Sequence, residues 1–131
     1  MKLYSDEILM FDAKAETATA TAYNIRDYQH IMLTLSSASS ANFTIKFQWS
    51  MSDTAPDFSA AQSDTNRWDY IQVKDYEDNA SIDGDTWVAF AGTDDVRQLE
   101  FNVNWLKWIS ASITTYAAWD ISLRCQAFSN T

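Results

Sequence analysis

The stretch "FTIKFQWSMS" (residues 43–52) alternates apolar and polar residues without interruption. Successive side chains of a β-strand point to opposite faces of a sheet, so this pattern predicts a strand with one buried face. The stretch "HIMLTLS" (residues 30–36) alternates in the same way, and small polar residues separate the two. We therefore predict a β-hairpin over residues 30–52. Its apolar positions in the second strand are Phe43, Ile45, Phe47, Trp49 and Met51.

The same period of two runs through the rest of the chain, and helical spacing is hard to find. Turn residues separate the alternating segments every 8 to 15 residues, which gives about nine short strands. We predict one all-β domain over residues 1–131, folded as an antiparallel β-sandwich or jelly roll, because no crossover helices are present for a parallel sheet. The remaining predicted strands cover residues 7–11, 16–23, 68–76, 86–90, 97–103, 108–114 and 120–128.

One connection is much longer than the others. Residues 52–67 contain the only proline, Pro56, and structureless loops above about 12 to 15 residues are usually functional or contain a short helical turn. The sequence "PDFSAAQ" (residues 56–62) suits such a turn. We expect this segment to be a functional loop or to hold a turn that begins at Pro56.

The charge of the chain excludes several partners. The formal net charge is −9, and the nine Lys and Arg residues are spread singly along the sequence. Nucleic acids and anionic membranes need a positive stripe, so we expect neither as a partner. No apolar run approaches the roughly 18 residues of a membrane span, and the acidic residues near the start argue against a signal peptide.

Catalytic and cofactor motifs are missing from the sequence. His30 is the only histidine, no serine lies in a G-x-S-x-G motif, and two glycines cannot build a phosphate-binding loop. Cys125 is the only cysteine and shares the parity of neighbouring apolar residues, which favours a buried structural thiol. We predict a protein that is not an enzyme and has no cofactor.

Calcium is the one metal for which the sequence offers candidate ligands, and a solvated acidic turn is the alternative interpretation of the same residues. Ca²⁺ prefers several oxygen ligands from one loop, and an acidic stretch begins at the end of the predicted strand 68–76. Its spacing fails the EF-hand pattern, and Asp83-Gly84 is also a favoured hairpin pair, so a solvated acidic turn explains the stretch as well. The weak candidate ligands are Asp75, Glu77, Asp83 and Asp85.

Aromatic residues make up 15% of the chain and include six tryptophans. Several lie near predicted strand ends, where they suit either a protein interface or a platform that stacks on sugar rings. Residues 99–113 are too long for one strand, and we predict a break at residues 104–107 that places Trp105 where a hairpin prefers glycine. The candidate interface residues are Phe58, Trp68, Tyr76, Trp87, Trp105 and Trp108.

Four pieces of residues 52–114 carry a resemblance to a known family: "SDTAPDFSAAQS", "NRWDYIQVKD", "IDGDT" and "FAGTDDVR". The segment resembles small β-sandwich structural proteins of tailed bacteriophages, although those tend to carry glycine at the positions of Trp49, Trp87 and Trp105. The resemblance implies a virion component without catalytic residues, assembled in the host cytoplasm.

Together these observations predict a capsid decoration protein or head-associated accessory protein. Such a protein binds a lattice of capsid or head–tail proteins, and we expect it to form a homo-oligomer. The alternative is a carbohydrate-binding or receptor-binding module of the tail or fibre, because the exposed aromatic residues suit a glycan as well as a protein.

Overall fold

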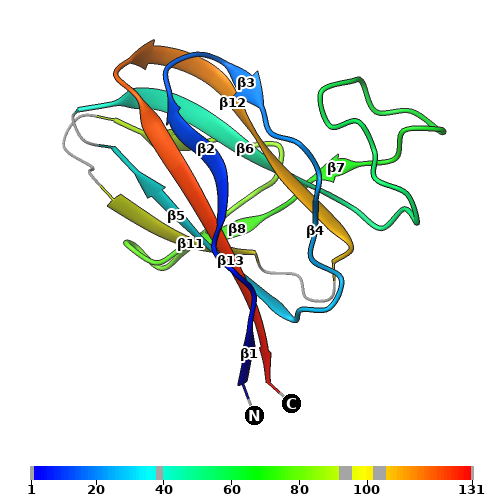
Figure 1. Ribbon diagram of the computed structural model, residues 1–131. Helices are drawn as coiled ribbons and strands as arrows, with labels where there is room; N and C mark the ends of the chain where they lie inside the picture. Colours follow the sequence, from blue (N-terminus) through cyan, green and yellow to red (C-terminus); the bar gives the residue numbers. More distant parts are fainter. Residues whose placement is uncertain (1, 38–39, 92–95, 102–105, 131) are drawn as a thin grey trace.

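The computed structural model describes residues 2–37, 40–91, 96–101 and 106–130. Thirteen strands of this described part form two antiparallel sheets that pack face to face (Figure 1). The predicted all-β sandwich is therefore confirmed. The described residues contain no helix, and hence none long and apolar enough to cross a membrane.

The first sheet has seven described strands, and β13 lies next to one edge of it. β13 pairs with β5 on one side, and with β1 and β2 in succession on the other. Its order is β1-β13-β5-β11-β8-β9, with β2 also on β13. The bounds are β1 Lys2–Tyr4, β2 Ile8–Lys14, β5 His30–Ser36, β8 Val73–Asp75, β9 Ala80–Ile82, β11 Val96–Phe101 and β13 Ile121–Asn130.

The second sheet has six described strands and is built on the long pair β6 and β12. Short strands flank this pair on both sides, and their shortness leaves little free edge for pairing with another chain. The order is β10-β6-β12-β3, with β7 also on β6 and β4 also on β12. The bounds are β3 Ala18–Thr19, β4 Tyr23–Asn24, β6 Asn42–Ser50, β7 Asp69–Tyr70, β10 Val88–Phe90 and β12 Trp108–Ala118.

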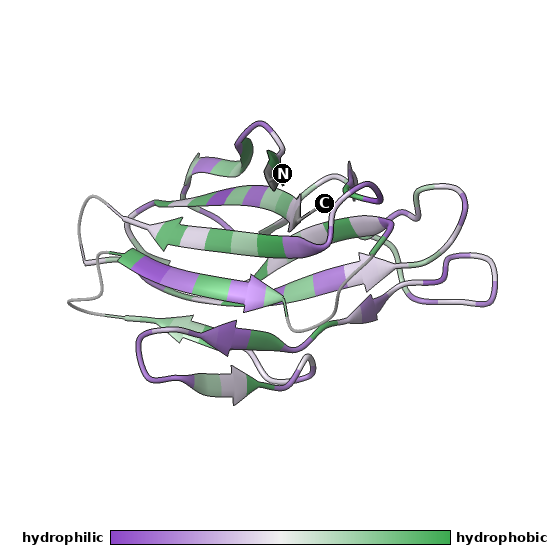
Figure 2. Ribbon diagram, turned by 90° about the horizontal axis from the view of Figure 1, so that it is seen from below, coloured by the Kyte–Doolittle hydropathy of each residue, from purple (hydrophilic) through white to green (hydrophobic). Residues whose placement is uncertain are grey.

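One hydrophobic cluster fills the space between the sheets. The apolar positions of β6 face it as the alternation predicts, and the ring of Phe47 meets that of Phe101 on β11 edge-on at 5.7 Å. Stripes of alternating hydropathy run along the strands in Figure 2. Each fully buried large apolar side chain of this cluster contributes about 1.5–3 kcal/mol relative to an exposed one.

The predicted hairpin over residues 30–52 is wrong, although both of its strands exist. β5 lies in the first sheet and β6 in the second, so the connection between them crosses from one sheet to the other. Asp83-Gly84 likewise joins β9 of the first sheet to β10 of the second. Alternation specifies which residues face the core, but it does not specify the neighbouring strand.

Two predicted strands are divided. The segment 16–23 forms only the short edge strands β3 and β4, which both pair with β12. The segment 68–76 contributes β7 to the second sheet and β8 to the first. The break within residues 99–113 is confirmed, since β11 ends at Phe101 and β12 begins at Trp108 in the other sheet. Because these strands lie in different sheets, the break is not a hairpin; Trp105 lies outside the described residues.

Backbone conformations explain how the chain turns with so few glycines. Asn79 has a φ of 57° between β8 and β9, and asparagine tolerates this left-handed region well. Gly84 is required for space, because a Cβ there would lie 2.7 Å from the Tyr70 carbonyl carbon. Ala13 and Trp119 also adopt positive φ, at 46° and 62°. Trp119 belongs to the two-residue connection between β12 and β13, where we did not expect a strained residue.

Candidate functional site

The loop of residues 51–68 covers the outer face of the second sheet at one end. Gln48 and Ser50 point away from the hydrophobic cluster, yet both are buried. Gln48 Nε2 donates to the Phe58 carbonyl at 3.0 Å, and Ser50 Oγ donates to the Arg67 carbonyl at 2.5 Å. Sequence reasoning missed both residues because alternation assigns them to the solvent side. The loop is thus attached to the sheet by side chains of β6.

Asn66 holds the loop together from inside. Its Oδ1 accepts from the Asp57 N–H at 2.9 Å, while its Nδ2 donates to the carbonyls of Asp57 at 2.8 Å and Ala61 at 3.1 Å. The expected turn after Pro56 is a single hydrogen-bonded turn, in which the Ala60 N–H donates to the Asp57 carbonyl at 3.2 Å. These bonds give the loop a defined shape without regular secondary structure.

The turn after Pro56 also carries an Asx motif. The hydroxyl and amide of Ser59 both donate to the Asp57 carboxylate, and they hold the pKa of that carboxyl below its ordinary value. The carboxylate form therefore favours the turn. The side chain of Asp57 serves the backbone of the loop rather than an external ligand.

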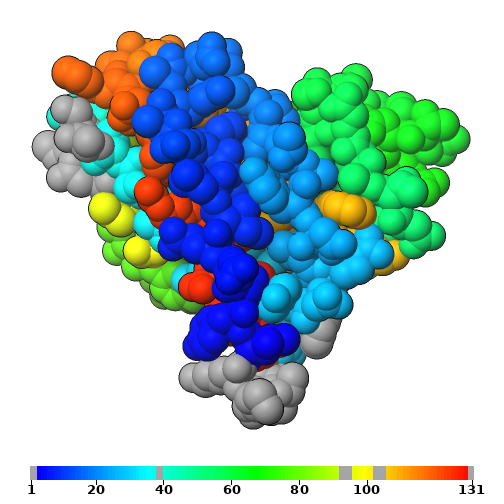
Figure 3. Space-filling view, in the orientation of Figure 1, coloured from blue at the N-terminus to red at the C-terminus, as the bar shows by residue number. Residues whose placement is uncertain are grey.

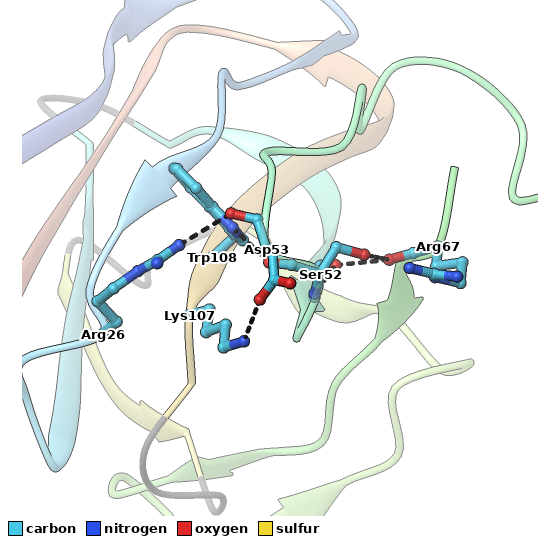
Figure 4. Close-up of polar contacts among 7 residues, drawn as sticks. Arg26, Ser52, Asp53, Arg67, Lys107 and Trp108 are labelled. Atoms are coloured by element: carbon cyan, nitrogen blue, oxygen red, sulfur yellow. Dashed lines mark hydrogen bonds and ion pairs between the residues drawn. The ribbon is translucent and has the colours of Figure 1, made fainter. Parts of the chain in front are cut away.

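The base of the loop is fastened to β12 (Figure 4). Trp108 Nε1 donates to the Ser52 carbonyl at 2.9 Å, and Lys107 Nζ lies 2.9 Å from Asp53 Oδ1. Arg26 covers the Trp108 ring at 5.1 Å. The hydrogen bond from Lys107 and its positive charge lower the pKa of Asp53. Trp108, a candidate interface residue, therefore also has a structural role, because it fixes the base of the loop to β12.

A groove of about 440 Å³ lies between the loop and the outer face of the second sheet. In Figure 3 the loop forms a separate lobe (green) beside the N-terminal segment (blue). Trp68 Nε1 donates to the Ala60 carbonyl at 3.0 Å, and the Trp68 ring meets Tyr70 edge-on at 5.2 Å. The lining residues are Thr19, Gln48, Phe58, Ser59, Ala60, Ala61, Gln62, Trp68, Tyr70 and Ser112.

A second hollow of about 270 Å³ adjoins the groove on the same sheet face. It is lined by Trp87 and Lys46 with three threonines, Thr44, Thr114 and Thr115. The Lys46 ammonium lies 4.5 Å from the centre of the Tyr70 ring, and Lys46 is the register partner of Ser112. Since Tyr70 and Ser112 both line the groove, the two hollows form one continuous surface.

The candidate aromatic residues do not come together at one place. Trp87 and Tyr76 are exposed on different sheets, and Trp68 lies half-buried in the groove. Phe58 is only 4% exposed and packs 6.0 Å from the Trp68 ring, so its proposed place at an interface is wrong. The most exposed of the described large apolar side chains is Trp119 at 61%, a residue that sequence reasoning had left in a turn.

Two of the weak calcium candidates, Asp75 and Glu77, lie against Arg97. Asp75 is fully buried and forms an ion pair with Arg97, whose Nη1 also donates to the Ala89 carbonyl at 2.9 Å. Asp75 is thus a structural partner that helps Arg97 join the two sheets, and its assignment as a ligand is wrong. Within the described ranges, no group of three or more His, Cys, Asp or Glu residues is placed to hold a metal ion.

His30 and Tyr76 share a carboxylate on the first sheet. The Tyr76 hydroxyl donates to Glu100, which raises the pKa of Tyr76, and His30 Nδ1 lies 3.8 Å from the other Glu100 oxygen. The His30 ring stacks on Phe128 at 5.0 Å. His30 is the first residue of β5, and these contacts occupy its ring on the first sheet.

Comparisons with known proteins identify the fold. No protein-family model matches the sequence, and no curated protein matches it significantly. The SPBc2 prophage-derived protein YomS matches 98% of this chain and 96% of its own, with a TM-score of 0.69 and 9% identity. The PBSX exported protein XepA matches 98% of this chain but 38% of its own, with a TM-score of 0.70 and 11% identity. The chain therefore shares its β-sandwich fold with these two proteins.

Proposed function

We propose that this protein is a non-enzymatic component of a bacteriophage particle, a capsid decoration or head-associated accessory protein that binds a protein lattice. Two lines of support come from likeness to other proteins. The fold is shared along nearly the whole chain with a prophage-derived protein, and the sequence of residues 52–114 resembles phage structural proteins. The contact site is supported by the structure of the β12–β13 corner.

Trp119 is the observation that carries this proposal. Its backbone has a φ of 62°, in a region that costs a residue with a Cβ about 1–2 kcal/mol. Its ring is 61% exposed, so burial within this chain offsets little of that cost. Tryptophan is the residue most enriched at the energetic centres of protein interfaces. A partner that buries the ring would explain why a large aromatic residue occupies a position suited to glycine.

The position of the corner is compatible with attachment to a lattice. Trp119 follows the last residue of β12, whereas the loop of residues 51–68 is fastened to the first residue of that strand. The eleven residues of β12 span about 36 Å. Attachment through the Trp119 corner would leave the loop and its groove on the far end of the molecule (Figure 1).

The proposal is tested by binding of the purified chain to phage particles that lack it. We expect the wild-type protein to sediment with the particles and Trp119→Gly to lose most of this binding, because Trp119→Gly removes the ring while suiting the backbone. Trp87→Ala, which removes another exposed tryptophan, is the matched control and should bind normally. A wild-type chain that is monomeric by light scattering and does not bind particles would refute the proposal.

A further inference from the structure

We propose that the groove under the loop of residues 51–68, together with the adjoining hollow at Trp87, is a binding site for a neutral oligosaccharide. This inference goes beyond the proposed attachment to a particle and does not depend on it. It concerns a different surface: no lining residue of the groove or of the hollow is Trp119, and the groove lies under the loop that is fastened to the first residue of β12. The argument rests on the charge of the lining, an unpaired buried acceptor and the placement of the aromatic rings.

The groove is lined entirely by uncharged residues, although the chain has a net charge of −9. Its polar groups are amides, hydroxyls and backbone atoms, which donate and accept hydrogen bonds without selecting a charge. Its volume of about 440 Å³ lies within the ordinary range for small-ligand sites, about 300–1,000 Å³. These features suit a neutral ligand that is rich in hydroxyl groups.

Gln48 supplies a hydrogen-bond acceptor that has no partner. Its side chain is 2% exposed, and the donor Nε2 is assigned by the Phe58 carbonyl at 3.0 Å, because only the nitrogen can donate to that oxygen. The remaining atom, Oε1, is buried without a hydrogen bond. Buried acceptors are nearly always satisfied in folded proteins. Gln48 lines the groove, so a small rotation of its amide would present this acceptor to a ligand hydroxyl.

Further hydroxyls line the groove across from the loop. Thr19 and Ser112 lie on adjacent strands with their hydroxyl oxygens 3.0 Å apart. Each hydroxyl can donate one bond and accept another, so the pair retains capacity for a ligand while bonded to each other. The sheet side of the groove thus offers rotatable donors and acceptors, while the loop side offers aromatic rings.

The rings are held in fixed orientations. Trp68 is oriented by its hydrogen bond to Ala60, by an edge contact with Tyr70 and by a tilted contact with Phe58. A pyranose ring has an apolar face of C–H groups and a rim of hydroxyls, so it stacks on an aromatic face while its rim bonds to neighbouring polar groups. The combination of fixed rings and hydroxyls beside them matches both parts of a sugar.

The adjoining hollow extends the site along β6 and favours a chain over a single sugar. Gln48 and Thr44 are four residues apart on this strand, a span of about 13 Å. Trp87 is 53% exposed beside Thr44, Thr114 and Thr115, which repeats the pairing of a ring with hydroxyls. Lys46 lies between the two hollows with its ammonium over Tyr70. A second sugar unit would stack on Trp87.

The test begins with the full chain on an array of neutral and acidic glycans, followed by titration of a neutral hit monitored by tryptophan fluorescence. We expect Trp87→Ala to weaken binding of the oligosaccharide about tenfold. Trp119→Ala removes an exposed tryptophan outside the groove and should leave the affinity unchanged. Ala61→Glu places a charge on the exposed rim of the groove and should also weaken binding.

Gln48→Leu tests the unpaired acceptor directly. We expect this variant to lose at least tenfold in affinity for the oligosaccharide while Trp119→Ala retains it. If Gln48→Leu fails to fold, the two surface variants Trp87→Ala and Ala61→Glu carry the test. The proposal is overturned if no neutral glycan binds, if only acidic glycans or peptides bind, or if Trp87→Ala and Ala61→Glu bind like the wild type. Binding to particles through Trp119 is measured separately, so either proposal can fail alone.

Discussion

Trp119 combines a left-handed backbone conformation with a largely exposed aromatic side chain. It occupies one of only two positions that join β12 of the second sheet to β13 of the first. So short a connection between sheets needs an unusual backbone angle, and the chain adopts it at a tryptophan. The strain is local, and its removal can be measured.

Trp119→Gly should make the folded protein slightly more stable. Glycine adopts positive φ without strain, which saves about 1–2 kcal/mol, but its extra freedom in the unfolded chain costs about 0.5–1 kcal/mol. We expect a net gain of about 0.5–1 kcal/mol in the free energy of unfolding, measured by urea denaturation. Trp119→Ala keeps a Cβ and should show no such gain; equal stability of the two variants would contradict the strain argument.

Cys125 should be chemically inert until the protein unfolds. Burial raises the pKa of its thiol to about 12, so almost none of it is thiolate in the folded state at pH 8. A thiol-specific reagent should therefore react at the rate of unfolding in buffer, and within seconds in 8 M urea. Rapid labelling of the native protein at pH 8 would show that the site is open.

At this scale sequence reasoning identified the kind of residue more readily than its position in the chain. It identified Cys125 as a buried thiol and expected one tryptophan at a position that suits glycine. It chose Trp105, which lies outside the described residues, and the structure shows this feature at Trp119. The choice depends on which strands are joined by a two-residue connection, and that information is not local.

Among the elements, the loop of residues 51–68 is held mainly by buried and internal hydrogen bonds. Asn66 makes three of these bonds to loop backbone groups, whereas Asp53 forms one ion pair at the exposed surface. Surface ion pairs contribute little because water and salt screen them. The two kinds of contact should therefore respond very differently to mutation.

Asn66→Ala should destabilise the loop, and Asp53→Asn should not. Loss of the Asn66 side chain leaves the Asp57 N–H and the Ala61 carbonyl without their partner, which we expect to cost about 1–2 kcal/mol in the free energy of unfolding. The same change should quench or shift the fluorescence of Trp68, since the ring is positioned by the loop. Asp53→Asn should leave both measurements unchanged. The reverse order of effects would mean that the base, not the interior, holds the loop.

The elements also mark the limit of what the sequence can predict. Period-two alternation located the core-facing residues of β5, β6, β11 and β13, because one face of each strand meets the hydrophobic cluster. The exception is Met51, which follows the end of β6 and is 47% exposed. It did not reveal that consecutive strands such as β5 and β6 lie in opposite sheets. The groove could not be predicted from the sequence pattern for a related reason. Gln48 is a polar residue that is buried by the loop of residues 51–68, and alternation alone assigns it to the solvent side.

Across the whole molecule, the two sheets depend on one shared core. Strands from both ends of the chain meet at β13, which pairs with β1, β2 and β5. Both sheets contribute side chains to the same hydrophobic cluster, and Arg97 links them at an edge through Asp75 and the Ala89 carbonyl. Neither sheet can bury its apolar face without the other.

This shared core predicts a single cooperative unfolding transition. Curves measured by far-ultraviolet circular dichroism and by tryptophan fluorescence should coincide in urea, as expected for a two-state domain. Phe47→Ala removes the ring that meets Phe101 across the sheets, and we expect it to lower the free energy of unfolding by about 3–5 kcal/mol. Because both sheets lose the same contact, the two probes should shift together. Separate midpoints for the two probes in this variant would show that one sheet holds its structure after the other has unfolded, which the common core forbids.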